Sequence, residues 1–164
     1  MIIRIASQLT ATIAIAAVIT GCASRGVAER QPVVDPVAER LDTYVFEDGA
    51  VRHDTTNPEV ARLWQEYSTQ RRTGNLSEAK VTLEEAISLE PRDPALWSSA
   101  AELELDQNSH LRAENYAAKS NFLATLGNRP LRYRNWLIIQ RAREGRGDLL
   151  GAREAEIESS KLSP

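Results

Sequence analysis

The clearest pattern in the chain is the spacing of apolar residues from Pro58 onward, which follows the period of amphipathic α-helices. Proline fits the first turn of a helix, and glycine or asparagine favours the turn that follows one. The predicted helix starts are Asn57-Pro58, Asp93-Pro94 and Arg129-Pro130, and the predicted turns are Gly74-Asn75, Gln107-Asn108-Ser109 and Gly145-Arg146-Gly147. The sequence therefore predicts an all-α fold of three antiparallel helix pairs.

An internal period connects the three pairs. In each pair a large apolar residue precedes a small alanine by 16 positions, as Leu63 precedes Ala79. These offsets resemble the tetratricopeptide repeat of roughly 34 residues, which implies a short superhelix over residues 59–164. The positions that carry the resemblance are Leu63, Ala79, Leu83, Ala86, Pro91, Trp97, Ala101, Ala113, Trp136 and Ala152.

The second and third repeats depart from this pattern. The second is five residues longer between Ala113 and Pro130 than the first is between Ala79 and Pro91, and we place the insertion in its second helix or exit loop. Polar residues stand at core positions of the third repeat. A terminal repeat needs a polar outer face, so these residues fit a cap as well as they fit divergence. They are Gln140, Glu156 and Ser159.

The three tryptophans receive different predictions. Trp97 and Trp136 fall on the large core position of the repeat, so we expect both in the core. Leu63 already fills that position in the first repeat, which turns Trp64 toward the concave surface formed by the first helices. Packing of Trp64 against the preceding linker is an equally good interpretation.

The first 21 residues have the features of an export signal. Arg4 supplies a positive charge, and residues 5–20 form an apolar stretch with polar interruptions. A membrane-spanning helix needs roughly 20 predominantly apolar residues, so a cleaved signal fits better than a permanent membrane helix.

Cys22 is the one cysteine of the chain, so neither an internal disulfide nor a cysteine-rich zinc site is available. The run Ile19-Thr20-Gly21-Cys22 resembles a bacterial lipobox, in which the cysteine is lipidated and becomes the first residue. The resemblance implies membrane attachment through Cys22, and Ala23 after it implies the outer membrane. A buried free thiol is the poorer interpretation, because Cys22 borders a polar linker.

Residues 22–58 are predicted to be a flexible tether, since they contain three prolines and few large apolar groups. Residues 43–52 have the pattern of a short hairpin around Asp48-Gly49. This hairpin either docks on the helical body or waits for a partner.

The sequence contains no catalytic motif, and we expect no enzymatic activity, cofactor or metal site. The acidic runs Glu84-Glu85 and Glu102-x-Glu104-x-Asp106 are interpreted as solvated helix faces. A formal net charge of −3 argues against nucleic acid as a partner.

Charge is unevenly distributed along the helical region. Residues 60–118 carry six basic and ten acidic residues, whereas residues 129–153 carry seven arginines and two acidic residues. The arginines either bind an acidic or C-terminal peptide in the groove of the first helices or pair with neighbouring acidic helices. The candidate groove residues are Trp64, Arg71, Arg72, Glu102, Arg134, Leu137 and Arg141.

A short array on a lipid-anchored tether, with the segments Asn135-Trp136-Leu137-Ile138, Arg141-Ala142-Arg143 and Gly147-Asp148, resembles the pseudomonad-type lipoprotein activators of class A penicillin-binding proteins. The resemblance implies a periplasm-facing outer-membrane protein that binds a peptidoglycan synthase. The alternatives are a scaffold or assembly lipoprotein of a pilus or secretion complex, and a structural envelope lipoprotein.

Replacing Cys22 with serine tests the lipobox. The hydroxyl cannot carry the thioether-linked lipid, so we expect the variant to accumulate as an unlipidated, unprocessed precursor. Mass spectrometry of the membrane fraction measures both the attached lipid and the removal of the signal. Normal processing of the variant would contradict the prediction.

Overall fold

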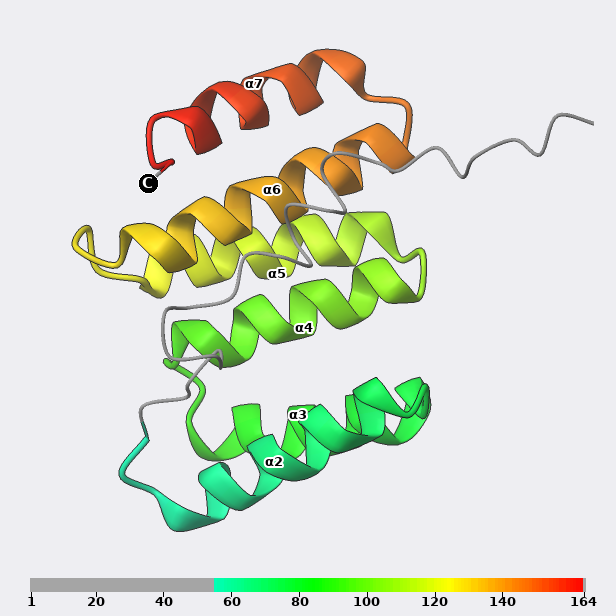
Figure 1. Cartoon of the computed structure of the whole chain (residues 1–164), viewed down its shortest axis with the longest axis vertical. Helices are drawn as coiled ribbons and strands as arrows, with labels where there is room; N and C mark the ends of the chain where they lie inside the picture. Colours follow the sequence, from blue (N-terminus) through cyan, green and yellow to red (C-terminus); the bar gives the residue numbers. More distant parts are fainter. Residues whose placement is uncertain (1–54, 164) are drawn as a thin grey trace, which may run out of the picture. The chain divides into compact units, whose positions relative to one another are not determined.

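The computed structural model describes residues 55–163, and the helices there form three consecutive pairs (Figure 1). They are α2 (Pro58–Arg72), α3 (Leu76–Leu89), α4 (Pro94–Asp106), α5 (His110–Leu123), α6 (Arg129–Gly145) and α7 (Leu149–Ser160). The described residues contain no strand, so the predicted all-α fold is confirmed. The predicted signal, Cys22, the tether and the hairpin at residues 43–52 lie outside the described residues.

The first helix of each pair begins at a capped proline turn, as the sequence predicts. The side chain of Asn57 accepts a hydrogen bond from the Glu59 amide at 3.0 Å. Asp93 accepts from the amides of Ala95 and Leu96 at 2.7 and 3.3 Å. These side chains occupy backbone donors that have no partner within the helix, and so they fix where each helix starts.

The turns within the pairs use left-handed backbone conformations. Gly74 has a φ of +81°, Asn108 of 56° and Gly147 of +77°. Glycine adopts this region without steric cost, and asparagine adopts it more readily than most residues. These positions reverse the chain, so that the two helices of a pair lie antiparallel.

Helix α4 contributes to two hydrophobic clusters. Leu96, Ala100 and Leu103 pack with apolar residues of α2 and α3, whereas Ala101 packs with α5, α6 and α7. The repeat alanines Ala79, Ala86 and Ala113 are completely buried, and small side chains at these positions let neighbouring helices approach closely.

None of the described helices is long and apolar enough to cross a bilayer.

The core prediction for Trp97 and Trp136 was wrong. Both are half buried, and the neighbouring Leu96 and Leu137 are completely buried instead. The adjacent residue on a helix is rotated by about 100°, so these neighbours take the inner position. The indole Nε1 of Trp97 needs a polar partner, and it donates to the carbonyl of Pro91 at 2.9 Å at the edge of the interface.

The placement of the five-residue insertion was also wrong in large part. Helix α5 has 14 residues, the same as α3, and its exit loop is one residue longer than the loop after α3. The other four residues lie at the start of α6, which begins seven residues before Trp136, whereas α4 begins three before Trp97. Pro130 therefore corresponds to Pro94 at a helix start.

The polar residues of the third repeat do not form the outer face of a cap. Gln140 and Ser159 are buried, and Glu156 is half buried. Gln140 donates to Glu144 at 2.9 Å, and the Ser159 hydroxyl donates to the Glu156 carbonyl at 2.9 Å. These partners within the same helices satisfy the Ser159 hydroxyl and the Gln140 amide nitrogen, whereas Oε1 of Gln140 is buried without a hydrogen bond.

A glycine pair tests the turn geometry. Gly147→Ala should lower the free energy of unfolding by about 1 kcal/mol, because an alanine is strained at a left-handed φ. Gly127→Ala is the matched control, since Gly127 has an ordinary φ and open space around its Cα. Urea unfolding followed by circular dichroism measures both variants, and an equal effect of the two substitutions would contradict this explanation of the turn.

Candidate functional site: the first-helix surface and the inter-pair pocket

Three of the predicted groove residues form one ion-pair network. Glu102 on α4 accepts from Arg71 of α2, with Nη1 to Oε2 at 2.6 Å, and from Nε of Arg134 of α6. Arg71 also pairs with Asp106 through Nε at 2.7 Å. The network connects the first helices of all three pairs. Its α4–α6 contact is buried, with Glu102 5% and Arg134 8% exposed, whereas the side chains of Arg71 and Asp106 are partly exposed.

The two arginines keep Glu102 ionised. Burial alone would raise the pKa of Glu102, but Arg134 and Arg71 outweigh it and hold the pKa below its ordinary value of 4.5. Burial raises the pKa of the neighbouring Tyr67 to about 12, and its hydroxyl donates to the carbonyl of Ser99 at 3.3 Å. The network is therefore a fixed set of charges at neutral pH.

A second carboxylate on α4 is buried in the same way. Glu104 is 2% exposed and pairs with Lys80 of α3, from Nζ to Oε1 at 2.7 Å, and with Arg112 of α5, from Nε to Oε2 at 2.8 Å. The interpretation of Glu102 and Glu104 as solvated residues was therefore wrong. Each carboxylate has its own cations, so the two do not form an acid–base pair.

The arginine-rich third pair also uses its charges internally. Arg143 and Arg146 both pair with Glu114 of α5, with Nε of Arg143 at 2.8 Å from Oε1. With Arg134, three arginines of this pair contact acidic residues of the second pair. For these three arginines, the prediction that they pair with neighbouring acidic helices is therefore confirmed.

The other predicted groove residues differ in accessibility. Leu137 is completely buried, so its side chain does not line an open groove. Trp64 is half buried, with its ring 5.5 Å from that of Tyr67. Arg72 is exposed, and the Arg141 side chain is 41% exposed, with Nη1 at 4.0 Å from Glu144. Their role in partner binding stays a prediction.

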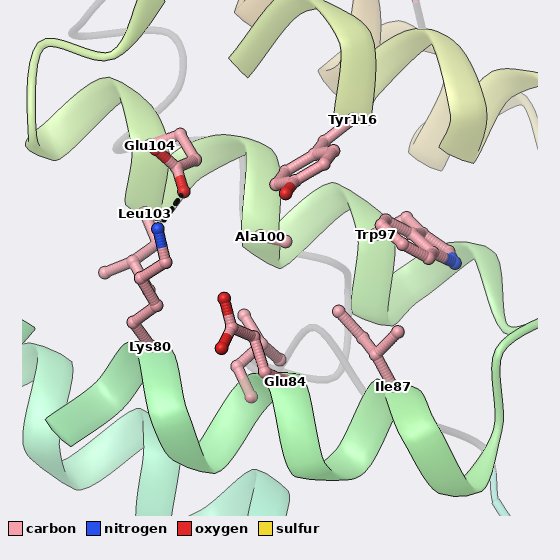
Figure 2. Close-up of a pocket in the computed structure, with 9 residues that line it drawn as sticks. Lys80, Glu84, Ile87, Trp97, Ala100, Leu103, Glu104 and Tyr116 are labelled. Atoms are coloured by element: carbon pink, nitrogen blue, oxygen red, sulfur yellow. Dashed lines mark hydrogen bonds and ion pairs between the residues drawn. The ribbon is translucent and has the colours of Figure 1, made fainter. Parts of the chain in front are cut away.

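A pocket of about 90 Å³ opens where the first pair meets the second (Figure 2). Helices α3, α4 and α5 contribute its walls, and Figure 2 shows Ile87 and Trp97 facing each other across it. The Trp97 and Tyr116 rings are in edge contact, with centroids 5.3 Å apart. Sequence reasoning missed this pocket, because its walls come from three helices.

The described residues contain no group of three side chains suited to hold a metal ion.

Comparison with known proteins gives one informative similarity. No family model matches the chain, and no curated protein matches it. A solved structure, the globular C-terminal domain of P. aeruginosa LpoP, matches with 28% sequence identity and a TM-score of 0.61. The helical domain resembles that of LpoP. The sequence-based resemblance to a tetratricopeptide-type lipoprotein of this kind is thereby confirmed.

The match covers 99% of the LpoP chain and 65% of this chain. The similarity to LpoP therefore extends over an entire globular domain. At 28% identity, the helical domain of this chain and the LpoP domain share a fold, and about a quarter of their aligned residues are identical.

Glu102→Gln tests the buried network. The amide cannot neutralise Arg71 and Arg134, so we expect a loss of about 3 to 5 kcal/mol in unfolding free energy at pH 7. The folded pKa of Glu102 is depressed, so the stability it provides is present above pH 4.5 and is lost as the pH falls through the folded value.

Urea midpoints at pH 7 and below pH 4.5 measure this difference for wild type, Glu102→Gln and the control Glu85→Gln, whose side chain is exposed. The Glu102 variant should show a smaller acid-induced decrease than the other two. An identical decrease in all three proteins would show that Glu102 does not contribute to acid sensitivity.

Proposed function

We propose that this protein is a lipid-anchored outer-membrane protein whose helical domain binds a class A penicillin-binding protein and stimulates its glycan polymerisation. The observation that carries the proposal is the similarity to the whole C-terminal domain of LpoP. The order of segments supports it as well, because a lipobox-like segment and a predicted tether precede the helical array.

The described surface fits a binding module. Glu102 and Glu104 are buried in ion pairs with basic residues of neighbouring helices, so they are not poised as a general acid and base. The helices instead form a packed array of consecutive pairs, the kind of architecture that repeat proteins use to bind other proteins. Its role is therefore contact with the synthase, which performs the chemistry.

The predicted tether would separate the helical domain from the outer membrane. The 35 or so residues between Cys22 and α2 would span roughly 35 Å as a flexible chain. Lipidation with two or three acyl chains provides durable attachment, since each buried methylene adds about 0.8 kcal/mol. A domain attached in this way would stand away from its bilayer, where the periplasmic part of a synthase is the proposed partner.

Reconstitution tests this function. The lipoprotein and a class A penicillin-binding protein from the same cell are combined in detergent, and the rate of glycan polymerisation from lipid-linked precursor is measured. We expect the rate to rise with lipoprotein concentration and to saturate. Leu137→Asp is the control, because a charge at this completely buried position should unfold the array and abolish stimulation.

Crosslinking in cells separates the alternatives. Recovery of the synthase with the lipoprotein supports the proposal. Recovery of pilus or secretion components, together with no stimulation in the reconstituted assay, would favour an assembly factor. Attachment to peptidoglycan alone would favour a structural role.

A further inference from the structure

The groove formed by the first helices offers little unused chemistry for a partner. Arg134 and Glu102 are buried in a shared ion pair, and Leu137 is part of the core. A partner that used these groups would have to break contacts that hold the helix pairs together. The pocket among α3, α4 and α5 instead has walls that are not completely covered by the described chain.

The size and walls of this pocket suit one apolar side chain. Its volume is about 90 Å³, whereas a single water needs only about 10 to 15 Å³. Leu83 and Leu103 are almost completely buried at its base, and the half-buried Trp97 and Tyr116 form an aromatic wall. Concave apolar pockets of this kind hold the anchor residues of protein interfaces. The apolar lining residues are Leu83, Ile87, Trp97, Ala100, Leu103 and Tyr116.

The charged residues at the pocket indicate which residues would flank the apolar side chain of a partner. Lys80, Glu84 and Glu104 are the charged lining residues, and Lys80 is already paired with Glu104 at 2.7 Å. Glu84 is exposed, and no ion pair or hydrogen bond joins its carboxylate to another residue of the described region. Lys119 lies over the Trp97 ring, 3.5 Å from its centroid, and is not part of the lining. A positive group beside the anchor would therefore complement Glu84.

We propose that the pocket among α3, α4 and α5 binds a leucine-sized or phenylalanine-sized side chain of a partner segment in which lysine or arginine flanks that residue. The inference rests on the proposed function in one respect, because the expected partner is the synthase. It places the contact at the junction of the first and second pairs and away from the first-helix groove.

Blocked tripeptides test the pocket without any synthase. The acetylated and amidated peptides Lys-Leu-Lys, Lys-Ala-Lys and Glu-Leu-Glu are titrated into the full chain in detergent, and the indole N–H signals are followed by NMR. The chain has three tryptophans, so Trp64 and Trp136 are internal controls for Trp97. We expect Lys-Leu-Lys to shift the Trp97 signal and the other two peptides to bind at least about tenfold more weakly. Equal responses to all three peptides, or no Trp97 response up to about 10 mM, would overturn the proposal.

Variants then connect the pocket to the partner. Glu84→Lys should weaken binding of the synthase by about tenfold or more, whereas Glu85→Lys, an exposed neighbour outside the pocket lining, should leave it unchanged. Ala100→Leu should place its own side chain in the pocket and weaken binding while helicity is retained. Equal effects of the Glu84 and Glu85 variants would show that the pocket is not the contact.

The two proposals fail separately. If the wild-type chain does not bind or stimulate the synthase, the proposed function is wrong, and the tripeptide titration alone decides whether the pocket binds a basic-flanked apolar side chain. If stimulation is observed and the pocket variants behave as wild type, the function stands and the pocket proposal is overturned.

Discussion

The arrangement of the array depends on the two buried carboxylates of α4. A buried ionised carboxylate is costly unless it is paired and hydrogen-bonded. Glu102 meets this requirement with arginines from α2 and α6, whereas Glu104 is hydrogen-bonded to Lys80 of α3 and paired without a hydrogen bond to Arg112 of α5. The central helix therefore requires the pair before it and the pair after it to be in place. Such networks need not add net stability, but they penalise any packing that leaves a charge unpaired.

Both hydrophobic clusters and ion pairs hold the three helix pairs together. One cluster joins the first pair to α4, and another joins α4 and α5 to the third pair. Much of the second cluster is alanine, which allows close helix contact but buries little apolar area per residue. Charged contacts from Glu102 and Glu114 to α6 cross this same junction. These ion pairs fix how α6 is aligned along α4 and α5, because the small alanine side chains at this junction specify that alignment only weakly.

This use of charge also decides which surfaces remain for a partner. Arg71, Arg134, Arg143 and Arg146 are paired with acidic residues of the array, so a groove model based on unpaired arginines overstates the positive charge of the groove. The junction of the first and second pairs differs, because Ala100 is small and Trp97 stays at the edge. The same half-burial that removes Trp97 from the core makes its ring part of a pocket wall. Trp97 thus connects the packing of α4 with the pocket at which we propose that a partner binds.

The sequence by itself determined the helices, their pairing and the alanine positions, because these follow from local rules. Asn57-Pro58 and Asp93-Pro94 cap a helix, and Gly74 and Gly147 reverse the chain, whatever surrounds them. Only the tertiary structure decided the burial of Glu102, the half-burial of Trp97 and the existence of the pocket. The physical reason is that each depends on side chains from other helices. An acidic residue on a helix looks solvated until cations from neighbouring pairs enclose it, and local periodicity does not reveal those cations.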